Sequence, residues 1–307
     1  MKKVKVKEIL PLLSGSDQVV GNTDNYFTNI RTAENINEES LDWINPKRQN
    51  KYEYLNNSRA NVIICGKDVE IPDALKNNKC FILADDPKLT FVRIANSLFI
   101  NKVEYSIHPT AVIHPEAEIP EKCFIGPYTY IGKSSIGEDT IVYGNCHIYD
   151  GVIIGKHVII KPGTVIGADG FGYVRNQQDE FEKFPHVGGV VVRDYVEIGS
   201  NTCIDRGALG DTIIDEGAKI DSLVHISHNV KIGKHSAIVS NVTIGGSTVI
   251  GNYTWIAPSA VLKDHVVVGH KCTVGTGAVV TKNIPDGEIW TSLSARPLNR
   301  FAKKQSD

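Results

Sequence analysis

The sequence is short of several residue types that mark particular protein classes. Methionine occurs once, tryptophan three times, and aromatic residues make up only 7% of the 307 residues. The six cysteines are scattered without a Cys-x-x-Cys pair. A disulfide framework is therefore not expected, no metal site is expected from ligand spacing, and a reducing cytoplasm is the expected location.

Neither sign of charge dominates, and long apolar runs are missing. Lys and Arg together number 33 and Asp and Glu 35, for a formal net charge of -2. A chain this close to neutral lacks the broad positive field that attracts duplex nucleic acid. We therefore expect no nucleic-acid partner. No apolar run approaches the roughly 18 residues of a spanning helix, so no membrane span is expected.

What the sequence does contain is an internal repeat of six residues. Aliphatic residues recur at every sixth position through much of residues 107–280, with the longest unbroken series from Ile214 to Val280. A period of six fits neither a helix nor an alternating strand. It predicts a parallel β-helix, in which three hexads form one coil and one aliphatic residue per short strand points inward. Gly, Asn or Asp is expected at the turns, where φ is often positive.

The first hundred residues follow a different pattern. Two apolar runs, residues 62–65 and 81–84, predict buried strands, and the apolar spacing within residues 89–99 predicts a helix. We therefore expect residues 1–101 to form a small α/β domain in front of the repeat.

The repeat region is expected to span residues 102–285, followed by a short C-terminal cap and tail over residues 286–307. One large insertion, residues 167–189, interrupts the hexads. Insertions in solenoids form loops on one face, which is often the binding face. The insertion therefore predicts where a ligand binds.

Three motifs carry a resemblance to a known family. They read Ala-Asp-Gly-Phe-Gly-Tyr at residues 168–173, Asp-Arg-Gly-Ala at residues 205–208, and Ile-Ser-His-Asn-Val-Lys-Ile-Gly at residues 226–233. In this order they resemble the UDP-3-O-(3-hydroxyacyl)glucosamine N-acyltransferases of lipid A synthesis, which belong to the left-handed β-helix, hexapeptide-repeat acyltransferases. The resemblance implies a left-handed coil, a homotrimer, and transfer of a 3-hydroxyacyl group from a thioester to a nucleotide-linked amino sugar. It implies no tightly bound cofactor, since acyl carrier protein or coenzyme A brings the acyl group as a co-substrate.

Attack of a sugar amine on a thioester needs a group that accepts a proton, and imidazole suits this because it titrates near neutral pH. The matched motif makes His228 the predicted general base. The resemblance also makes Asp221 and His265 substrate-binding candidates, and a carboxylate such as Asp221 could orient the imidazole. The Gly246 amide, one coil of 18 residues after His228, is a candidate oxyanion donor. An ordinary turn carboxylate and a routine turn glycine remain the alternatives for Asp221 and Gly246.

Two further groups of residues are predicted to bind substrate. A substrate-facing loop is expected from Asp169, Phe171 and Tyr173. In the N-terminal domain, the Asn-Pro-Lys element at residues 45–47 matches the family's nucleotide-recognition element. Asn45 is expected to bond a base edge and Lys47 to meet a diphosphate, while Trp43 either stacks on the base or packs in the core.

Two other functions stay open. The first is a coenzyme A-dependent N-acyltransferase that places a short acyl group on a UDP- or dTDP-amino sugar for O-antigen or capsule. Val279 and Thr281 favour it, because the resembling family usually carries methionines there that help to measure the acyl chain. The second is a non-catalytic β-helix scaffold, which the irregular insertion and the His228 motif argue against.

Overall fold

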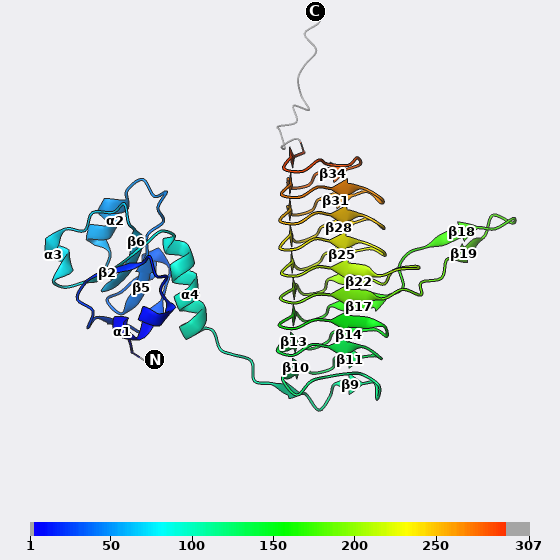
Figure 1. The fold of residues 1–307 in the computed structure, drawn as a ribbon, viewed down its shortest axis with the longest axis horizontal. Coiled ribbons are helices and arrows are strands. Elements are labelled where there is room, and N and C mark those ends of the chain that lie inside the picture. The colour runs from blue at the N-terminus through cyan, green and yellow to red at the C-terminus, as the bar shows by residue number, and fades with distance from the viewer. Residues whose placement is uncertain (1–2, 293–307) are drawn as a thin grey trace, which may run out of the picture. The chain divides into compact units, whose positions relative to one another are not determined.

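The computed structural model describes residues 3–292, and the chain divides into two compact units, Met1–Lys102 and Val103–Asp307 (Figure 1). Residues 293–307, most of the predicted C-terminal cap and tail, lie outside the described residues. Within the described part of the chain, no helix has the length and apolar character needed to cross a membrane.

The N-terminal unit is a small α/β fold, as predicted. Its main sheet has the order β2-β7-β6-β5-β4, in which β4 to β7 are parallel and β2 is antiparallel to β7. The strands of this sheet are β2 (Gln18–Gly21), β4 (Asn29–Ile30), β5 (Ser40–Trp43), β6 (Val62–Gly66) and β7 (Cys80–Ala84). A separate pair joins β1 (Val4–Lys5) to β3 (Tyr26–Phe27). The helices are α1 (Val6–Ile9), η1 (Leu10–Leu12), η2 (Ala33–Asn35), α2 (Lys51–Asn57), α3 (Asp73–Lys76) and α4 (Pro87–Phe99).

Both predicted strands lie at the centre of this sheet. All five residues of β6 are buried, and alternate residues join different apolar clusters: Ile64 packs in one and Ile63 in the other. Because alternate side chains of a strand point to opposite faces, the sheet is covered on both sides. This explains why the strand is a continuous apolar run.

The predicted helix exists, but the face expected to be buried is partly wrong. Asp86 caps α4 by accepting a hydrogen bond from the Leu89 backbone N–H at 3.0 Å, so the helix begins at Pro87. The buried residues include Thr90 and Ile94. Leu89 and Val92, which fit the apolar spacing, are exposed. The helix packs against the sheet with the neighbouring face, which carries Thr90 and Ile94.

The second unit is a parallel β-solenoid, which confirms the predicted fold. Its short strands form three parallel sheets within the described residues, and the coils stack in a column (Figure 1). The first sheet contains β8 (Ser106–Ile107), β10 (Cys123–Ile125), β13 (Thr140–Val142), β16 (Ile159–Ile160), β21 (Glu197–Ile198), β24 (Lys219–Ile220), β27 (Ala237–Ile238), β30 (Trp255–Ile256), β33 (Thr273–Val274) and β35 (Ile289–Trp290). The second contains β9 (Val112–Ile113), β11 (Tyr130–Ile131), β14 (His147–Ile148), β17 (Val165–Ala168), β22 (Cys203–Asp205), β25 (His225–Ile226), β28 (Thr243–Ile244), β31 (Val261–Leu262) and β34 (Val279–Val280). The third contains β12 (Ser135–Ile136), β15 (Val152–Ile154), β20 (Val190–Val192), β23 (Thr212–Ile214), β26 (Lys231–Ile232), β29 (Val249–Ile250) and β32 (Val267–Val268).

The hexad residues stack inside the solenoid in strict register. Ile226 pairs with Ile244, which pairs with Leu262 one coil further on, and all three are buried. Each inward residue therefore packs on its equivalent in the neighbouring coils. Ile107 is 49% exposed, because β8 pairs with a solenoid strand on one side only.

The turns accept more residue types than expected. At one corner the φ angles of Asn229, Ser247 and His265, in three successive coils, are 60°, 59° and 60°. Left-handed backbone costs a non-glycine residue about 1–3 kcal/mol. Hydrogen bonds between coils offset this cost, since the Ser247 N–H donates to the His228 carbonyl and the His265 N–H to the Gly246 carbonyl, both at 2.9 Å.

The insertion at residues 167–189 contains a β-hairpin. Strands β18 (Tyr173–Arg175) and β19 (Phe181–Lys183) pair antiparallel and project from the side of the solenoid (Figure 1). The chain returns to the solenoid at β20. The insertion therefore places its base, and not its tip, beside the coils.

Candidate active site

His228 lies at the corner between the second and third sheets, two residues after the end of β25. Gly246 occupies the equivalent position one coil further on, as the repeat predicted. The backbone of Gly246 lies against the imidazole: a Cβ atom built there would be 2.8 Å from His228 Nε2. Residue 246 has to be a glycine, because the His228 ring occupies the space that a side chain would need.

A neighbouring amide fixes the proton on the imidazole. Asn229 Oδ1 accepts a hydrogen bond from the Ala208 N–H at 3.0 Å, and Asn229 Nδ2 donates to the Gly210 carbonyl at 2.9 Å. These two bonds set which end of the amide is oxygen. His228 Nδ1, 3.1 Å from that oxygen, must then donate to it. Neutral His228 consequently carries its proton on Nδ1 and presents a bare Nε2 toward Gly246.

The Gly246 N–H is free to bind an oxygen atom. The adjacent N–H groups of Gly245 and Ser247 donate to backbone carbonyls of other coils, whereas no residue between 3 and 292 accepts a hydrogen bond from the Gly246 N–H. Its position next to the bare Nε2 suits an oxyanion donor beside a general base.

The base of the hairpin covers this corner. A Cβ on Gly170 would lie 3.1 Å from both His228 and His186, and a Cβ on Gly172 would lie 2.9 Å from the His186 ring. The two glycines carry no side chain, which lets the backbone approach other groups closely. In the structure they allow the loop to pack on two imidazoles.

The predicted loop residues surround the corner in different ways. Phe171 is 85% exposed and meets Tyr173 edge to face, with ring centroids 5.0 Å apart. Asp169 forms an ion pair with Lys183 across the hairpin base, and this pairing lowers the pKa of Asp169. Asp169 thus stabilises the loop through this ion pair, while the side chains of Phe171 and Tyr173 remain available to a ligand.

Two cavities meet at His228 and His265. One, of about 350 Å³, is lined on the hairpin side by Tyr173 and His186; the other, of about 330 Å³, is lined by Phe171 and Gly246. The structure therefore brings together five predicted residues that are far apart in the sequence, namely Phe171, Tyr173, His228, Gly246 and His265.

Sequence reasoning missed two buried groups at this site. His186 is 8% exposed, its ring centroid lies 5.4 Å from that of His228, and its Nδ1 donates to the Phe184 carbonyl at 2.9 Å. Asp205 is 5% exposed. Burial raises the pKa of Asp205, while the positive charges that His225, His228 and His186 can carry act in the opposite direction. His186 lies outside every matched motif, and Asp205 was seen only as part of one.

Three side chains near His228 have the chemistry of metal ligands. The ligand atoms of Cys203, Asp205 and His225 all lie within 4.8 Å of one another. The linear spacing gave no sign of this cluster because its members come from two neighbouring coils.

Asp221 is not part of this corner. It follows β24, at the turn between the first and second sheets, and its carboxylate accepts the Ser222 N–H at 2.7 Å. Within one chain, Asn229 and not Asp221 orients the His228 imidazole. Asp221 is exposed, in keeping with an ordinary turn carboxylate.

The predicted nucleotide-binding residues lie around the end of β5 in the N-terminal unit. Trp43 packs against Phe91 of α4, with ring centroids 6.1 Å apart, which favours its core-packing alternative. Asn45 and Lys47 are exposed, and Asn45 Oδ1 accepts the Lys47 N–H at 2.9 Å.

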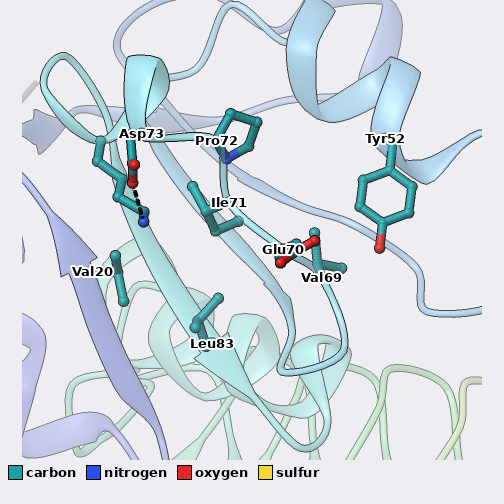
Figure 2. Close-up of a pocket in the computed structure, with 9 residues that line it drawn as sticks. Val20, Tyr52, Val69, Glu70, Ile71, Pro72, Asp73 and Leu83 are labelled. Atoms are coloured by element: carbon teal, nitrogen blue, oxygen red, sulfur yellow. Dashed lines mark hydrogen bonds and ion pairs between the residues drawn. The ribbon is translucent and has the colours of Figure 1, made fainter.

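The large cavity of this unit, about 730 Å³, lies elsewhere (Figure 2). Its walls include Val20, Tyr52, Pro72 and Leu83, and an ion pair between Asp73 and Lys76 lies at its edge. None of the three predicted nucleotide-binding residues lines it.

Comparison with known proteins agrees with the fold. The family model described as bacterial transferase hexapeptide (six repeats) matches residues 133–168, 211–246 and 247–282. UDP-3-O-acylglucosamine N-acyltransferase of Coxiella burnetii, strain Dugway 5J108-111, is 33% identical over 311 residues, covering 93% of this chain and 88% of that protein. The same values hold for the protein of strain RSA 493.

Solved structures show the same solenoid. UDP-N-acetylglucosamine acyltransferase from Campylobacter jejuni is 26% identical, with a TM-score of 0.55, covering 64% of this chain and 79% of that one. The Arabidopsis UDP-N-acetylglucosamine acyltransferase, 21% identical with a TM-score of 0.51, covers 61% of this chain and 71% of that one, and shows the fold alone. The identity along nearly the whole chain decides the family: this protein belongs to the UDP-3-O-acylglucosamine N-acyltransferases, within the hexapeptide-repeat acyltransferases.

Proposed function

We propose that this protein transfers a 3-hydroxyacyl group from a thioester to the amine of a nucleotide-linked amino sugar, with UDP-3-O-acylglucosamine as the acceptor. The observation that carries the proposal is the fixed tautomer of His228, whose bare Nε2 lies against Gly246, a residue with a free backbone N–H, where two cavities meet. A base and an oxyanion donor side by side are what acyl transfer to an amine requires. The relatives named for this reaction support it.

The chemistry is one addition and one elimination. The amine nitrogen attacks the thioester carbonyl carbon, a C–N bond forms, and the carbonyl oxygen becomes an anion that the Gly246 N–H receives. The nitrogen loses a proton to His228 Nε2. The C–S bond then breaks as the C=O bond re-forms, and the imidazolium returns the proton to the departing thiolate, so the products are an amide and a thiol.

Asp205 supports the charged intermediate. His228 becomes positive when it accepts the proton, and the buried Asp205 carboxylate supplies a nearby negative charge. Attraction between opposite charges is stronger in a partly buried site than in water. The carboxylate thus stabilises the imidazolium that forms during the reaction.

The other site residues bind the two substrates. Phe171 and Tyr173 provide an apolar wall for the acyl chain or the sugar, and His265 provides a polar group that lines both cavities. Asn45 and Lys47 of the N-terminal unit receive the base and the diphosphate of the nucleotide, since both are exposed and polar.

A donor–acceptor screen tests this function. Purified protein is offered 3-hydroxyacyl carrier protein or short-chain coenzyme A thioesters, each with UDP-3-O-acylglucosamine or with simple UDP- and dTDP-amino sugars, and product masses are measured. We expect N-acylation of UDP-3-O-acylglucosamine by the carrier-protein donor. Activity only with short-chain coenzyme A would replace this function by the surface-polysaccharide alternative, and no product from any pair would favour a scaffold.

A further inference from the structure

The cluster formed by Cys203, Asp205 and His225, on the second sheet, has properties that acyl transfer does not need. A thiol, a carboxylate and an imidazole converge there, with Cys203 Sγ 3.9 Å from Asp205 Oδ1 and His225 Nε2 3.7 Å from Asp205 Oδ2. Ser227 Oγ is 3.2 Å from the same His225 Nε2. A nucleophilic triad would use both ring nitrogens of the histidine, so this arrangement is not one.

The carboxylate at the centre lacks a strong partner. Asp205 is more than nine-tenths buried, and its one side-chain hydrogen bond within residues 3–292 comes from the weak thiol donor of Cys203. Burying a carboxylate is unfavourable unless a cation or good donors compensate it. A cation bound between Asp205 and its two neighbours would remove this deficit.

The backbone already places the three ligands. Cys203 of β22 and His225 of β25 are directly paired in the parallel sheet, so their side chains project together from neighbouring coils. Asp205 is two residues after Cys203 on the same strand, which puts it on the same face. Strands of a stacked solenoid hold such positions more rigidly than loops do.

The geometry is close to that of a bound transition metal. Zinc bonds to sulfur, nitrogen and oxygen are about 2.0–2.3 Å long. Ligand atoms around a tetrahedral ion are then roughly 3.5 Å apart, so a closure of about 1 Å by side-chain rotation is enough. The His225 side chain is 45% exposed, which leaves one side of the cluster open to a water molecule as fourth ligand.

We propose that Cys203, Asp205 and His225 bind a zinc-type divalent cation, with water in the fourth position. A thiolate with an imidazole selects Zn²⁺ or Co²⁺ over Mg²⁺ and Ca²⁺, which prefer oxygen ligands. Binding releases the proton of the Cys203 thiol. This site shares Asp205 with the proposed reaction, which itself uses no metal.

The test uses Co²⁺ as the probe, since cobalt bound to sulfur absorbs in the near ultraviolet. The full-length protein is freed of metal by a chelator, kept reduced, and titrated with Co²⁺ alone and then with Zn²⁺ in competition. We expect one Co²⁺ per chain, a thiolate-to-cobalt charge-transfer band, and displacement of Co²⁺ by Zn²⁺.

Variants identify the ligands. Cys203→Ser should abolish the band and weaken Zn²⁺ binding at least tenfold, and His225→Gln, which alters an exposed side chain, should weaken it similarly. Cys272→Ser and His235→Gln, which change the same residue types away from the cluster, should bind as the unmodified protein does. Absence of the band, or a band that persists in Cys203→Ser, would overturn the proposal. The readout needs no acyl transfer, so it is independent of the outcome of the activity screen.

Discussion

At the scale of single residues, the proton position on His228 is the feature with the clearest consequence for activity. Replacing His228 with Ala removes the only atom proposed to take the amine proton. We expect kcat to fall by about 10²- to 10⁴-fold. The thermal midpoint should be nearly unchanged, because the substitution removes none of the inward residues that stack inside the solenoid. Matched measurements on His235→Ala, at another corner, should give normal turnover. Near-normal turnover in His228→Ala would refute the assignment.

The buried Asp205 carboxylate is expected to lower the stability of the fold while it supports activity. Burial raises the pKa of Asp205 above its ordinary value. A carboxyl group with a raised folded-state pKa contributes stability below its unfolded pKa of about 3.9, and loses that contribution as the pH rises through the folded pKa. At neutral pH the charged Asp205 therefore lowers the stability of the fold.

In metal-free buffer at pH 7, Asp205→Asn should therefore raise the melting temperature, by about 2 °C for a domain of this size. The gain should shrink as the pH is lowered toward 4. Turnover should drop about tenfold, because the negative charge that faces His228 is gone. A lower melting temperature would contradict the expected effect on stability, and full activity would contradict the expected effect on turnover.

At the scale of elements, the base of the hairpin is the part that forms a wall of the cavity beside His228. Tyr173, at the start of β18, lines the cavity beside His228, and its ring meets those of Phe171 and Phe181 in the same insertion. Tyr173→Ala should raise the KM for one of the two substrates several-fold without changing the melting temperature. Tyr128→Ala, an exposed tyrosine outside the insertion, is the control. Equal kinetics for the two variants would show that the hairpin does not bind substrate.

The elements also show what a sequence can predict. The coils were predictable because the inward residue of each strand recurs at a fixed interval, and the corner that joins His228 to Gly246 followed from the same interval. The role of Asn229 needed the orientation of one amide, which depends on carbonyl and N–H groups of residues 208–210. His186 reaches the site only because the hairpin folds back on the coils. No local pattern encodes that return.

At the scale of the whole molecule, we expect the working unit to be a trimer of identical chains. The outer face of the second sheet carries exposed aliphatic side chains such as Val261 and Val279, and the third sheet carries Val249 and Val267. Burying them between copies would stabilise an assembly. Native mass spectrometry should give three times 33.7 kDa, and a single-chain mass at micromolar concentration would contradict this.

The stacking of coils also determines how the molecule opens. Each coil touches only its neighbours, so fraying starts at the two ends of the column and advances one coil at a time. The coils that carry His228 and Gly246 lie inside the column, with paired strands on both sides. Amide hydrogens in these coils should exchange more slowly than those of the terminal coils. The corner formed by His228 and Gly246 is thus expected to keep its shape while the ends of the column open and close.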